Sequence, residues 1–295
     1  MPAGYIGRFA PSPSGPLHMG SLLTALASFL DARAAGGQWL LRIDDIDHQR
    51  CRPQWSTHIQ ETLQRYGFRW DGPALVQSQR LPLYQQYLQQ LREAGYLYAC
   101  TCSRSQRTAQ HTAQRLYAGV CRNRGLPFTS TCSWRLRLDD TAQWVSDLRL
   151  GTQQFLLPEC SGDIILRRRD GAIAYHLATV VDDALCQVTH VLRGEDLWPE
   201  TPVQLFLQGL CQFPSPQYLH VPLVTDTHGR KLSKQNHAQA LPTHHTGPVV
   251  MQLLTRLGMV PEPDWQDLSP EQLLQQAVTH WDRSTLCRMI HTQRR

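Results

Sequence analysis

The first 34 residues constrain the fold of this chain more than any other stretch, because they have the pattern of a strand, a loop and a helix in succession. Residues 5–9 are strand-like, residues 10–20 are rich in Pro, Ser and Gly, and residues 22–34 repeat Leu and Phe at the spacing of one buried helix face. We expect the helix to begin at Gly20 or Ser21. The start of a helix favours anions, since its free N–H groups and its dipole both carry partial positive charge. This stretch therefore predicts an α/β fold with an anion-binding loop.

The loop differs from two common phosphate-binding loops. It lacks the Gly-x-x-x-x-Gly-Lys-Ser/Thr pattern of a P-loop and the three spaced glycines of a dinucleotide-binding fingerprint. It ends instead in His18 and Gly20. The histidine can donate hydrogen bonds to phosphate oxygens, and the glycine lets a flat ring lie against the backbone. Taken alone, these residues are equally typical of a loop made of turn-forming residues.

A second stretch, residues 229–236, is a short basic segment after a predicted strand at residues 218–224. Lys231 and Lys234 flank a Leu-Ser pair within it. A mobile basic loop of this kind can reach a polyphosphate and neutralise negative charge as pyrophosphate leaves. Taken alone, such a segment is more often a solvated turn.

Three carboxylates, Asp44, Asp45 and Asp47, follow the apolar run at residues 38–43, which we predict to be a second, parallel strand. Open α/β sheets bind their ligands at the carboxyl ends of parallel strands. Close aspartates also occur at helix caps and in Mg²⁺ or Ca²⁺ sites, but no other residues here supply oxygen ligands at a regular spacing. We therefore expect a carboxylate that faces a substrate amino group. Arg193, at the end of a later strand, is suited to hold a carboxylate in a bidentate pair.

Cysteines gather around Cys100, Cys102 and Cys121. Two Cys with one residue between them, and a third 19 positions after Cys102, come close to a structural zinc site that lacks one ligand. The fourth ligand could be supplied by Tyr117, His111 or Cys132. The alternative is a set of unrelated free thiols. The odd total of nine cysteines, in a chain without an export sequence, argues against a disulfide framework.

The first loop and the basic segment together resemble the two signature motifs of the class I aminoacyl-tRNA synthetases. Residues 18–21 correspond to the HIGH motif and residues 231–235 to the KMSKS motif. The resemblance implies an α/β, Rossmann-like catalytic domain that uses ATP with Mg²⁺. It also implies catalytic roles for His18, Lys231 and Lys234, and contacts with ATP from His18, Gly20 and Lys234.

Four runs resemble the glutamyl branch of these enzymes: residues 8–20, 41–47, 168–183 and 193–197. The similarity extends to about Leu241 and implies that L-glutamate is the amino acid. By this resemblance, glutamate binds to Arg8, Phe9, Ala10, Pro11, Ser12, Asp44, Tyr175 and Arg193. The branch usually has Glu where this chain has Asp44, which would face the substrate ammonium group. Either a water fills the resulting gap or the pocket shifts.

The region after the KMSKS-like motif is short. About 60 residues follow Lys234, with helical patterns at residues 249–257 and 271–280, which is too little for a separate anticodon-binding domain. A shortened glutamyl enzyme with Cys-x-Cys and Tyr-x-x-x-Cys resembles the family that attaches glutamate to queuosine of tRNA(Asp). That family implies activation of glutamate without tRNA, and transfer to the cyclopentene diol of queuosine. It also implies a structural zinc ion held by Cys100, Cys102, Tyr117 and Cys121.

We divide the chain into four predicted parts. Residues 1–99 and 163–241 form two halves of the catalytic domain, residues 100–162 form an inserted zinc-bearing subdomain with a small antiparallel sheet, and residues 242–295 form a short helical C-terminal region. The net charge of +5 suits a nucleic-acid partner. Since the chain has no apolar run of 18 residues and no export sequence, we expect a cytoplasmic monomer without membrane contact.

Two other functions are consistent with these residues. One is an ordinary glutamyl-tRNA synthetase that charges the 3′ end of a tRNA, although the short C-terminal region disfavours it. The other is a catalytically silent tRNA-binding paralogue, which the presence of His18, Gly20 and Lys234 disfavours. Glutamate-dependent exchange of pyrophosphate into ATP separates an active enzyme from a silent paralogue.

Overall fold

A computed structural model describes residues 4–103, 116–117, 119–138, 140, 142–223 and 241–288. The parallel strands at its centre come from two parts of the chain that lie far apart in sequence. The first part pairs β1 with β2 and β2 with β3, and the second pairs β9 with β10. The bounds are β1 Ile6–Phe9, β2 Gln38–Ile43, β3 Leu75–Val76, β9 His190–Gly194 and β10 Gln217–Val221. The predicted α/β fold is confirmed.

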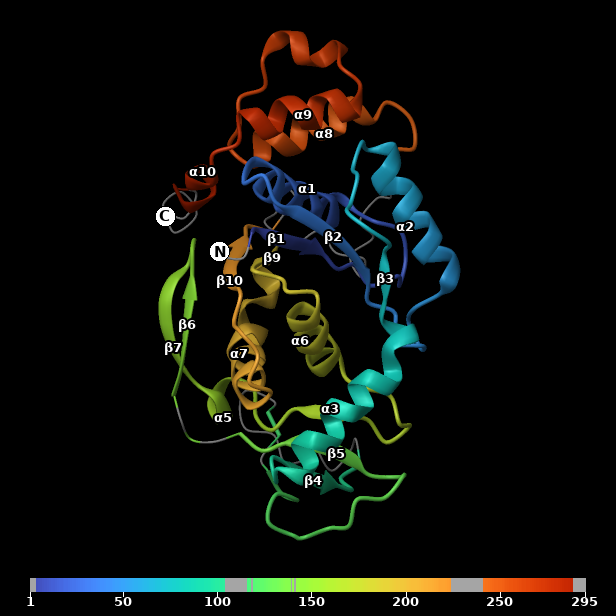
Figure 1. Cartoon of the computed structure of the whole chain (residues 1–295), viewed down its shortest axis with the longest axis vertical. Helices are drawn as coiled ribbons and strands as arrows, with labels where there is room; N and C mark the ends of the chain where they lie inside the picture. Colours follow the sequence, from blue (N-terminus) through green and yellow to red (C-terminus); the bar gives the residue numbers. More distant parts are fainter. Residues whose placement is uncertain are drawn as a thin grey trace.

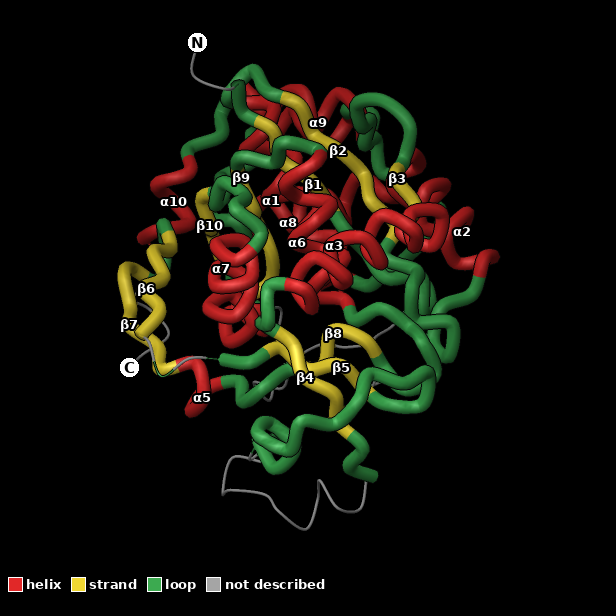
Figure 2. The backbone as a smooth tube through the Cα atoms, turned by 60° about the horizontal axis from the view of Figure 1, so that its bottom comes forward, coloured by secondary structure: helices red, strands yellow, loops and turns green. Residues whose placement is uncertain are grey.

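The direction of the chain across the sheet reverses at β1. From β1 the chain moves outward to β2 and β3, and it later returns on the other side of β1 as β9 and β10 (Figures 1 and 2). The backbone N–H of Thr189, just before β9, donates to the carbonyl of Ile6 in β1 at 2.9 Å. In open parallel sheets, ligands bind at the carboxyl ends of the strands beside such a reversal. The fold therefore predicts a ligand site among the loops that follow these strands.

Helix α1 (Met19–Ala34) follows the loop after β1 and begins earlier than the sequence predicts, because His18 caps it. His18 has an extended backbone, and its Nδ1 accepts a hydrogen bond from the N–H of Ser21 at 3.2 Å. A side-chain acceptor at this position satisfies one of the free N–H groups of the helix start. His18 is thereby held where the loop meets the helix.

Further helices alternate with the strands along the chain. Their bounds are α2 Pro53–Arg65, α3 Leu81–Glu93, α6 Tyr175–Leu185 and α7 Thr201–Leu210, with 3₁₀ turns at Gln77–Arg80 and Glu195–Glu200. Both α2 and α3 carry Pro in the first turn, where its missing N–H costs nothing. No helix in the described ranges is both long and apolar enough to cross a membrane.

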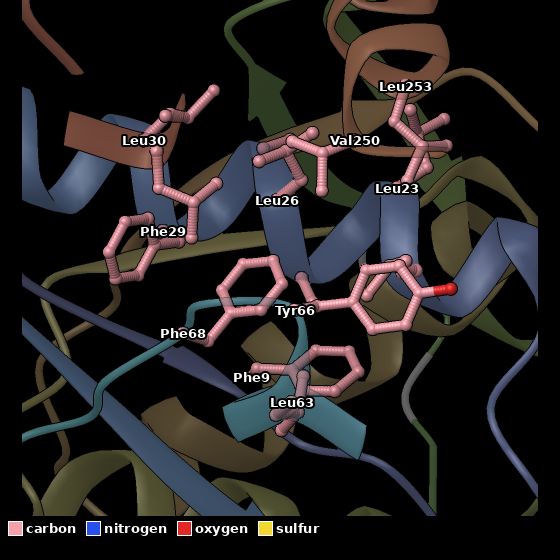
Figure 3. Close-up of a cluster of buried hydrophobic side chains, with 14 of the residues drawn as sticks. Phe9, Leu23, Leu26, Phe29, Leu30, Leu63, Tyr66, Phe68, Val250 and Leu253 are labelled. Atoms are coloured by element: carbon pink, nitrogen blue, oxygen red, sulfur yellow. The ribbon is translucent and has the colours of Figure 1, made fainter. Parts of the chain in front are cut away.

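The C-terminal helices enlarge the core of the catalytic domain. They are α8 Thr246–Arg256, α9 Pro270–Thr279 and α10 Arg283–Arg288, with a 3₁₀ turn at Pro263–Asp267. Figure 1 shows α8 and α9 lying over α1 at one end of the molecule. Leu23 and Leu26 of α1 lie in one buried cluster with Val250 and Leu253 of α8 (Figure 3). The predicted helical runs at 249–257 and 271–280 correspond to α8 and α9.

A small antiparallel sheet lies at the other end of the molecule, as Figure 1 shows. It joins β4 to β5 and β5 to β8, with bounds Leu97–Cys100, Ser133–Leu136 and Ile165–Arg167. A separate hairpin follows β5, formed by β6 Ala142–Asp147 and β7 Gly151–Leu156 and ending in the short α5 Leu157–Cys160. This hairpin extends the main sheet, since β6 pairs with β10 through Asp147 and Tyr218. Residues 100–162 thus contribute both to this end of the molecule, through Cys100 and β5, and to the central sheet, through the hairpin.

Candidate active site

A pocket of about 500 Å³ opens at the carboxyl ends of β1, β2, β9 and β10. Its walls come from the loop after β1, the start of α1, the residues after β2, the start of α6 and the residues after β9. The residues that the sequence singles out and that line it are Arg8, Phe9, Ala10, Pro11, Ser12, His18, Gly20, Asp44, Tyr175 and Arg193. Lys231 and Lys234 lie outside the described residues. The structure thus brings together residues that are up to 185 positions apart in sequence, from Arg8 to Arg193.

A chain of buried ion pairs forms one wall of the pocket. Asp183 of α6 accepts hydrogen bonds from Nε and Nη2 of Arg8 at 3.0 and 3.2 Å, and from Nη1 of Arg42 at 2.6 Å. Arg42 in turn holds both oxygens of Asp44, at 2.6 and 3.2 Å. Burial alone raises the pKa of the Asp183 carboxyl, but Arg8 and Arg42 hold it below its ordinary value. Burial raises the pKa of Asp44, and Arg42 opposes that rise.

The charges in this wall cancel, since two arginines face two aspartates. Within the described part of the chain, Nη1 of Arg8 has no hydrogen-bond partner, so Arg8 can still donate to a ligand. Asp44 lines the pocket with its carboxylate fixed by Arg42, which gives a ligand ammonium group a rigid acceptor.

Arg193 adds a further buried positive charge, which the two aspartates of this wall do not balance. It is 4% exposed and forms no ion pair with any described carboxylate. Its guanidinium donates instead to neutral groups: Nη1 to Gln204 at 2.7 Å and Nη2 to Thr201 at 2.7 Å. Burial lowers its pKa, because removal from water disfavours the charged form. A buried cation without a counter-ion is a site for an anionic ligand.

Tyr175 lies beside Arg193 at the first position of α6. Its hydroxyl accepts a hydrogen bond from Nε2 of Gln204 at 3.1 Å, and Oε1 of the same Gln204 accepts from Arg193. Burial raises the pKa of Tyr175, so the side chain keeps its hydroxyl proton and can donate it to a ligand. Gln204 therefore ties the tyrosine to the arginine.

The start of α1 forms the opposite part of the pocket. Because Nδ1 of His18 accepts from the N–H of Ser21, the proton of the neutral ring resides on Nε2. That Nε2 lies 3.1 Å from Oγ of Ser21. Gly20, Ser21 and Thr24 also line the pocket, so the first turn of the helix faces it. Such a helix start attracts phosphate groups.

The three carboxylates after β2 separate in the folded chain. Asp45 accepts hydrogen bonds from the N–H and Oγ of Ser78 at 2.7 and 2.6 Å, whereas Asp47 pairs with Arg50 at 2.7 Å. Among the described residues, these aspartates are not a group placed to share a metal ion. The metal alternative that the sequence leaves open at these positions is therefore not supported.

The cysteines do converge. The Sγ atoms of Cys100, Cys102 and Cys121 lie within 4.8 Å of one another. The hydroxyl of Tyr117 lies among them, 3.4 Å from Sγ of Cys100 and 3.5 Å from Sγ of Cys102. Cys132 points elsewhere and bonds to the carbonyl of Thr129 at 3.2 Å. His111 lies outside the described residues.

The electrostatics of this cluster suit a thiolate ligand. Burial alone raises the pKa of Cys121, but hydrogen bonds from the Thr101 backbone and from Tyr117, Cys102 and Cys100 lower it to about 7. Three sulfurs this close together are the donor type and number that a structural zinc site can use, with one further ligand to complete four. The donor set therefore fits zinc.

Sequence reasoning missed several residues that line or support the pocket. Asp183 and Arg42 anchor the ion-pair wall, and Gln204 connects Tyr175 to Arg193. The two adjacent aspartates at the end of the apolar run of α6 were the signal available for Asp183, since charges seldom lie on a buried helix without partners. No local pattern points to Gln204.

The chain is similar to known proteins over most of its length. Residues 6–289 match the model of the tRNA synthetases class I (E and Q), catalytic domain. The glutamyl-Q tRNA(Asp) synthetases of Thiobacillus denitrificans and Neisseria meningitidis are 47% and 44% identical, over 95% and 94% of this chain and 94% and 96% of their own lengths. A solved glutamate tRNA ligase of Elizabethkingia meningosepticum, in complex with its amino acid, superposes with a TM-score of 0.78 at 25% identity over 92% of this chain. The chain spans 64% of the length of that ligase.

Proposed function

The chain belongs to the class I glutamyl- and glutaminyl-tRNA synthetase family, and within it to the glutamyl-Q tRNA(Asp) synthetases, so we propose that it attaches glutamate to queuosine of tRNA(Asp). The first step is activation of L-glutamate with ATP, without tRNA. The second is transfer of the glutamyl group to a hydroxyl of queuosine. The buried charge of Arg193, which pairs with no carboxylate in the described part of the chain, is the observation that carries the choice of an acidic amino acid.

Arg193 binds the side-chain carboxylate of glutamate in this proposal. The other carboxylate must approach the phosphorus of ATP, so only the side-chain group can remain in a fixed contact throughout the reaction. Tyr175 donates its hydroxyl proton to the same ligand, and Asp44 and Arg8 hold the ammonium and carboxylate groups at the other end. Glutamine would leave the positive charge of Arg193 without a counter-ion, which is the basis for discrimination.

The start of α1 binds the triphosphate. Its free N–H groups and Nε2 of His18 are donors for phosphate oxygens, and Gly20 leaves room for the adenine ring. An oxygen of the α-carboxylate of glutamate attacks the α-phosphorus of ATP. The bond between the α-phosphorus and the oxygen that bridges it to the β-phosphorus breaks, and pyrophosphate leaves with the electron pair of that bond. No protein nucleophile is needed, so the chain contributes positioning and charge stabilisation. Mg²⁺ enters with ATP as part of the substrate.

Lys231 and Lys234 stabilise the leaving pyrophosphate. Of the 29 Lys and Arg residues of the chain, only these two are lysines. A lysine carries a compact ammonium on a flexible stem, whereas arginine has a rigid planar fork, so the two are not interchangeable at a moving phosphate. Because every other basic residue of this count is arginine, lysine at positions 231 and 234 supports a contact with the phosphates that arginine would not make equally well.

Transfer completes the reaction. A hydroxyl of the cyclopentene diol attacks the carbonyl carbon of glutamyl-adenylate, loses its proton, and AMP leaves. Exposed arginines at the pocket mouth are suited to the phosphate backbone of the tRNA. Arg50 lines the pocket with its side chain 75% exposed, and Arg168 lies 3.7 Å from the same Asp47.

A structural zinc ion completes the proposed protein. Cys100, Cys102, Tyr117 and Cys121 would hold it, and with four protein ligands it would have no open position for catalysis. Its contribution is to fix the turn between β4 and β5.

The acceptor is tested with two tRNA preparations. Labelled glutamate is offered, with ATP, to bulk tRNA from cells that make queuosine and to tRNA from cells that do not. Label on the queuosine-containing tRNA alone is the expected result. Equal label on both indicates ordinary charging of the 3′ end, and no label on either, together with no glutamate-dependent exchange of pyrophosphate into ATP, indicates a silent paralogue.

A further inference from the structure

Arg193 is held from behind by a second buried side chain. His220 of β10 is 0% exposed, and its Nε2 accepts a hydrogen bond from Nε–H of Arg193 at 3.1 Å. A guanidinium has donors but no acceptors, so this contact requires an unprotonated Nε2. The neutral ring of His220 then carries its proton on Nδ1.

Asp147 fixes that tautomer. Its Oδ2 lies 2.7 Å from Nδ1 of His220 and accepts the backbone N–H of the same residue at 3.0 Å. Its Oδ1 accepts the N–H groups of Arg149 and Leu150 at 2.9 and 2.8 Å, which holds the carboxylate in place. Burial alone raises the pKa of Asp147, but these hydrogen bonds, that of His220 first, lower it below its ordinary value. A charged Asp147 therefore keeps the ring proton on the side away from Arg193.

The other N–H donors of Arg193 show what the hydrogen bond to His220 does for the orientation of the guanidinium group. Nη1 donates to Gln204, and Nη2 donates to Thr201 and, at 3.4 Å, to the carbonyl of Leu197. With Nε bound to His220, four of the five N–H groups have partners among the described residues, and the fifth, on Nη1, has none there and is available to the pocket. His220 is the partner of Nε, and it defines the rotation of the guanidinium plane about the end of the side chain.

The hairpin of β6 and β7 supplies this support. Asp147 ends β6 and pairs with Tyr218, two residues before His220 on β10. The ring of Tyr218 also lies 5.2 Å from the guanidinium carbon of Arg193, a favourable cation–π distance. Residues far from the pocket in sequence thus reach it through the sheet.

We propose that His220 and Asp147 are positioning residues for glutamate recognition, which orient Arg193 toward the side-chain carboxylate. This inference rests on the proposed function, because Arg193 is the group proposed to bind that carboxylate. Neither residue touches the substrate. Their loss should weaken the binding of glutamate and leave the binding of ATP unchanged, since ATP lies at the start of α1.

The test uses His220→Phe, His220→Gln and Asp147→Asn in the full-length protein, with glutamate-dependent exchange of pyrophosphate into ATP as the assay. We expect the KM for glutamate to rise at least tenfold in His220→Phe and Asp147→Asn, while the KM for ATP changes less than twofold. His220→Gln restores an acceptor for Arg193 and should recover most of the affinity. Thr62→Val is the matched control, since Thr62 is likewise buried and polar but lies in α2, where its hydroxyl bonds to His58.

Parallel changes in both KM values, or an unchanged KM for glutamate in folded His220→Phe, overturn the proposal. A second measurement needs no variant: ¹⁵N NMR of the wild-type protein labelled at histidine should show His220 neutral and protonated on Nδ1 at neutral pH. A proton on Nε2 would equally overturn it. Absence of glutamate-dependent exchange in the wild type contradicts the proposed function itself, whereas wild-type exchange with unaffected variants contradicts only the positioning role.

Discussion

Arg8 of β1 and Asp183 of α6 form a buried, two-contact ion pair at 3.0 and 3.2 Å, although 175 residues separate them in sequence. Arg42 of β2 binds the same carboxylate at 2.6 Å. Asp183 therefore joins α6 to two strands that lie more than 140 positions earlier in the chain. This single carboxylate of α6 thus contacts both strands that, with α6, surround the pocket.

Replacement of Asp183 by Asn should be strongly destabilising. Removal of one partner from a buried ion pair leaves an uncompensated charge, here on Arg8 and Arg42, and typically costs about 3–5 kcal/mol. The free energy of unfolding from urea titration measures this loss. Asp170→Asn is the control. The side chain of Asp170 is 48% exposed and that of its partner Arg168 is 36% exposed, so this ion pair should contribute less than about 1 kcal/mol. Equal losses in the two variants would contradict the anchoring role of Asp183.

The same carboxylate should make stability depend on pH. The pKa of Asp183 lies below its ordinary value in the folded chain, so its contribution is fully present above the unfolded pKa of about 3.9. The contribution is lost as the pH falls through the lower, folded pKa. The difference in unfolding free energy between wild type and Asp183→Asn should therefore be constant from pH 7 to about pH 5 and shrink below about pH 4. A difference that stays constant down to pH 2 would show that Asp183 has no depressed pKa.

The zinc site is tested through its oxygen ligand. Tyr117→Phe removes the hydroxyl that lies 3.4 Å from Sγ of Cys100 and should weaken zinc binding at least about tenfold, since even the loss of an outer partner costs this much. Competition with a chromogenic chelator measures the affinity. Cys132→Ser should bind zinc as the wild type does, because Cys132 bonds to Thr129 instead. Loss of zinc in Cys132→Ser with retention in Tyr117→Phe would assign the fourth ligand to Cys132.

Gly67 tests the docking of the C-terminal helices. It has φ of +87°, and a Cβ there would lie 2.7 Å from the backbone nitrogen of Glu271 in α9. Gly72 has φ of +70° with nothing within 4 Å of such a Cβ, so Gly72→Ala measures the backbone strain alone, about 1–2 kcal/mol. We expect Gly67→Ala to cost about 1–3 kcal/mol more, from overpacking against α9. Thermal unfolding of the two variants, side by side, decides whether the packing is as close as the structure indicates.

Lys234→Ala should slow activation far more than it weakens glutamate binding. Loss of one group that stabilises developing charge lowers the rate by about 100-fold or more. The kcat and the KM for glutamate in the exchange assay separate the two effects, and equal losses in both would refute this role.

Since Lys231 and Lys234 are the only lysines of the chain, an amine-selective reagent should inactivate the protein, and ATP should protect it. Lys234→Arg should not restore full activity, because the two side chains bind phosphate differently.

Much of the fold follows from local sequence patterns. The spacing of apolar residues in α1, α8 and α9 indicates those helices, because residues three and four positions apart share a helix face. The exact start of α1 did not follow, since capping by His18 depends on the orientation of one ring. A small antiparallel sheet was expected in the inserted subdomain. The hairpin of β6 and β7 that lies there pairs with β10 instead of standing alone, and no local pattern encodes such a partner.

By itself, the sequence determined the α/β class, the two motif-like segments and ten of the residues that line one pocket, because each depends on near neighbours in the chain or on a short motif. Only the tertiary structure decided how their charges are balanced. The pairing of Arg8 with Asp183, and of Arg193 with His220 rather than with a carboxylate, depends on strands brought together by long-range packing. Hydrogen bonds and ion pairs act over a few ångströms in space, so their partners can lie anywhere in sequence. That is why the charge left unpaired at Arg193, on which the recognition of glutamate is proposed to rest, becomes visible only in the folded chain.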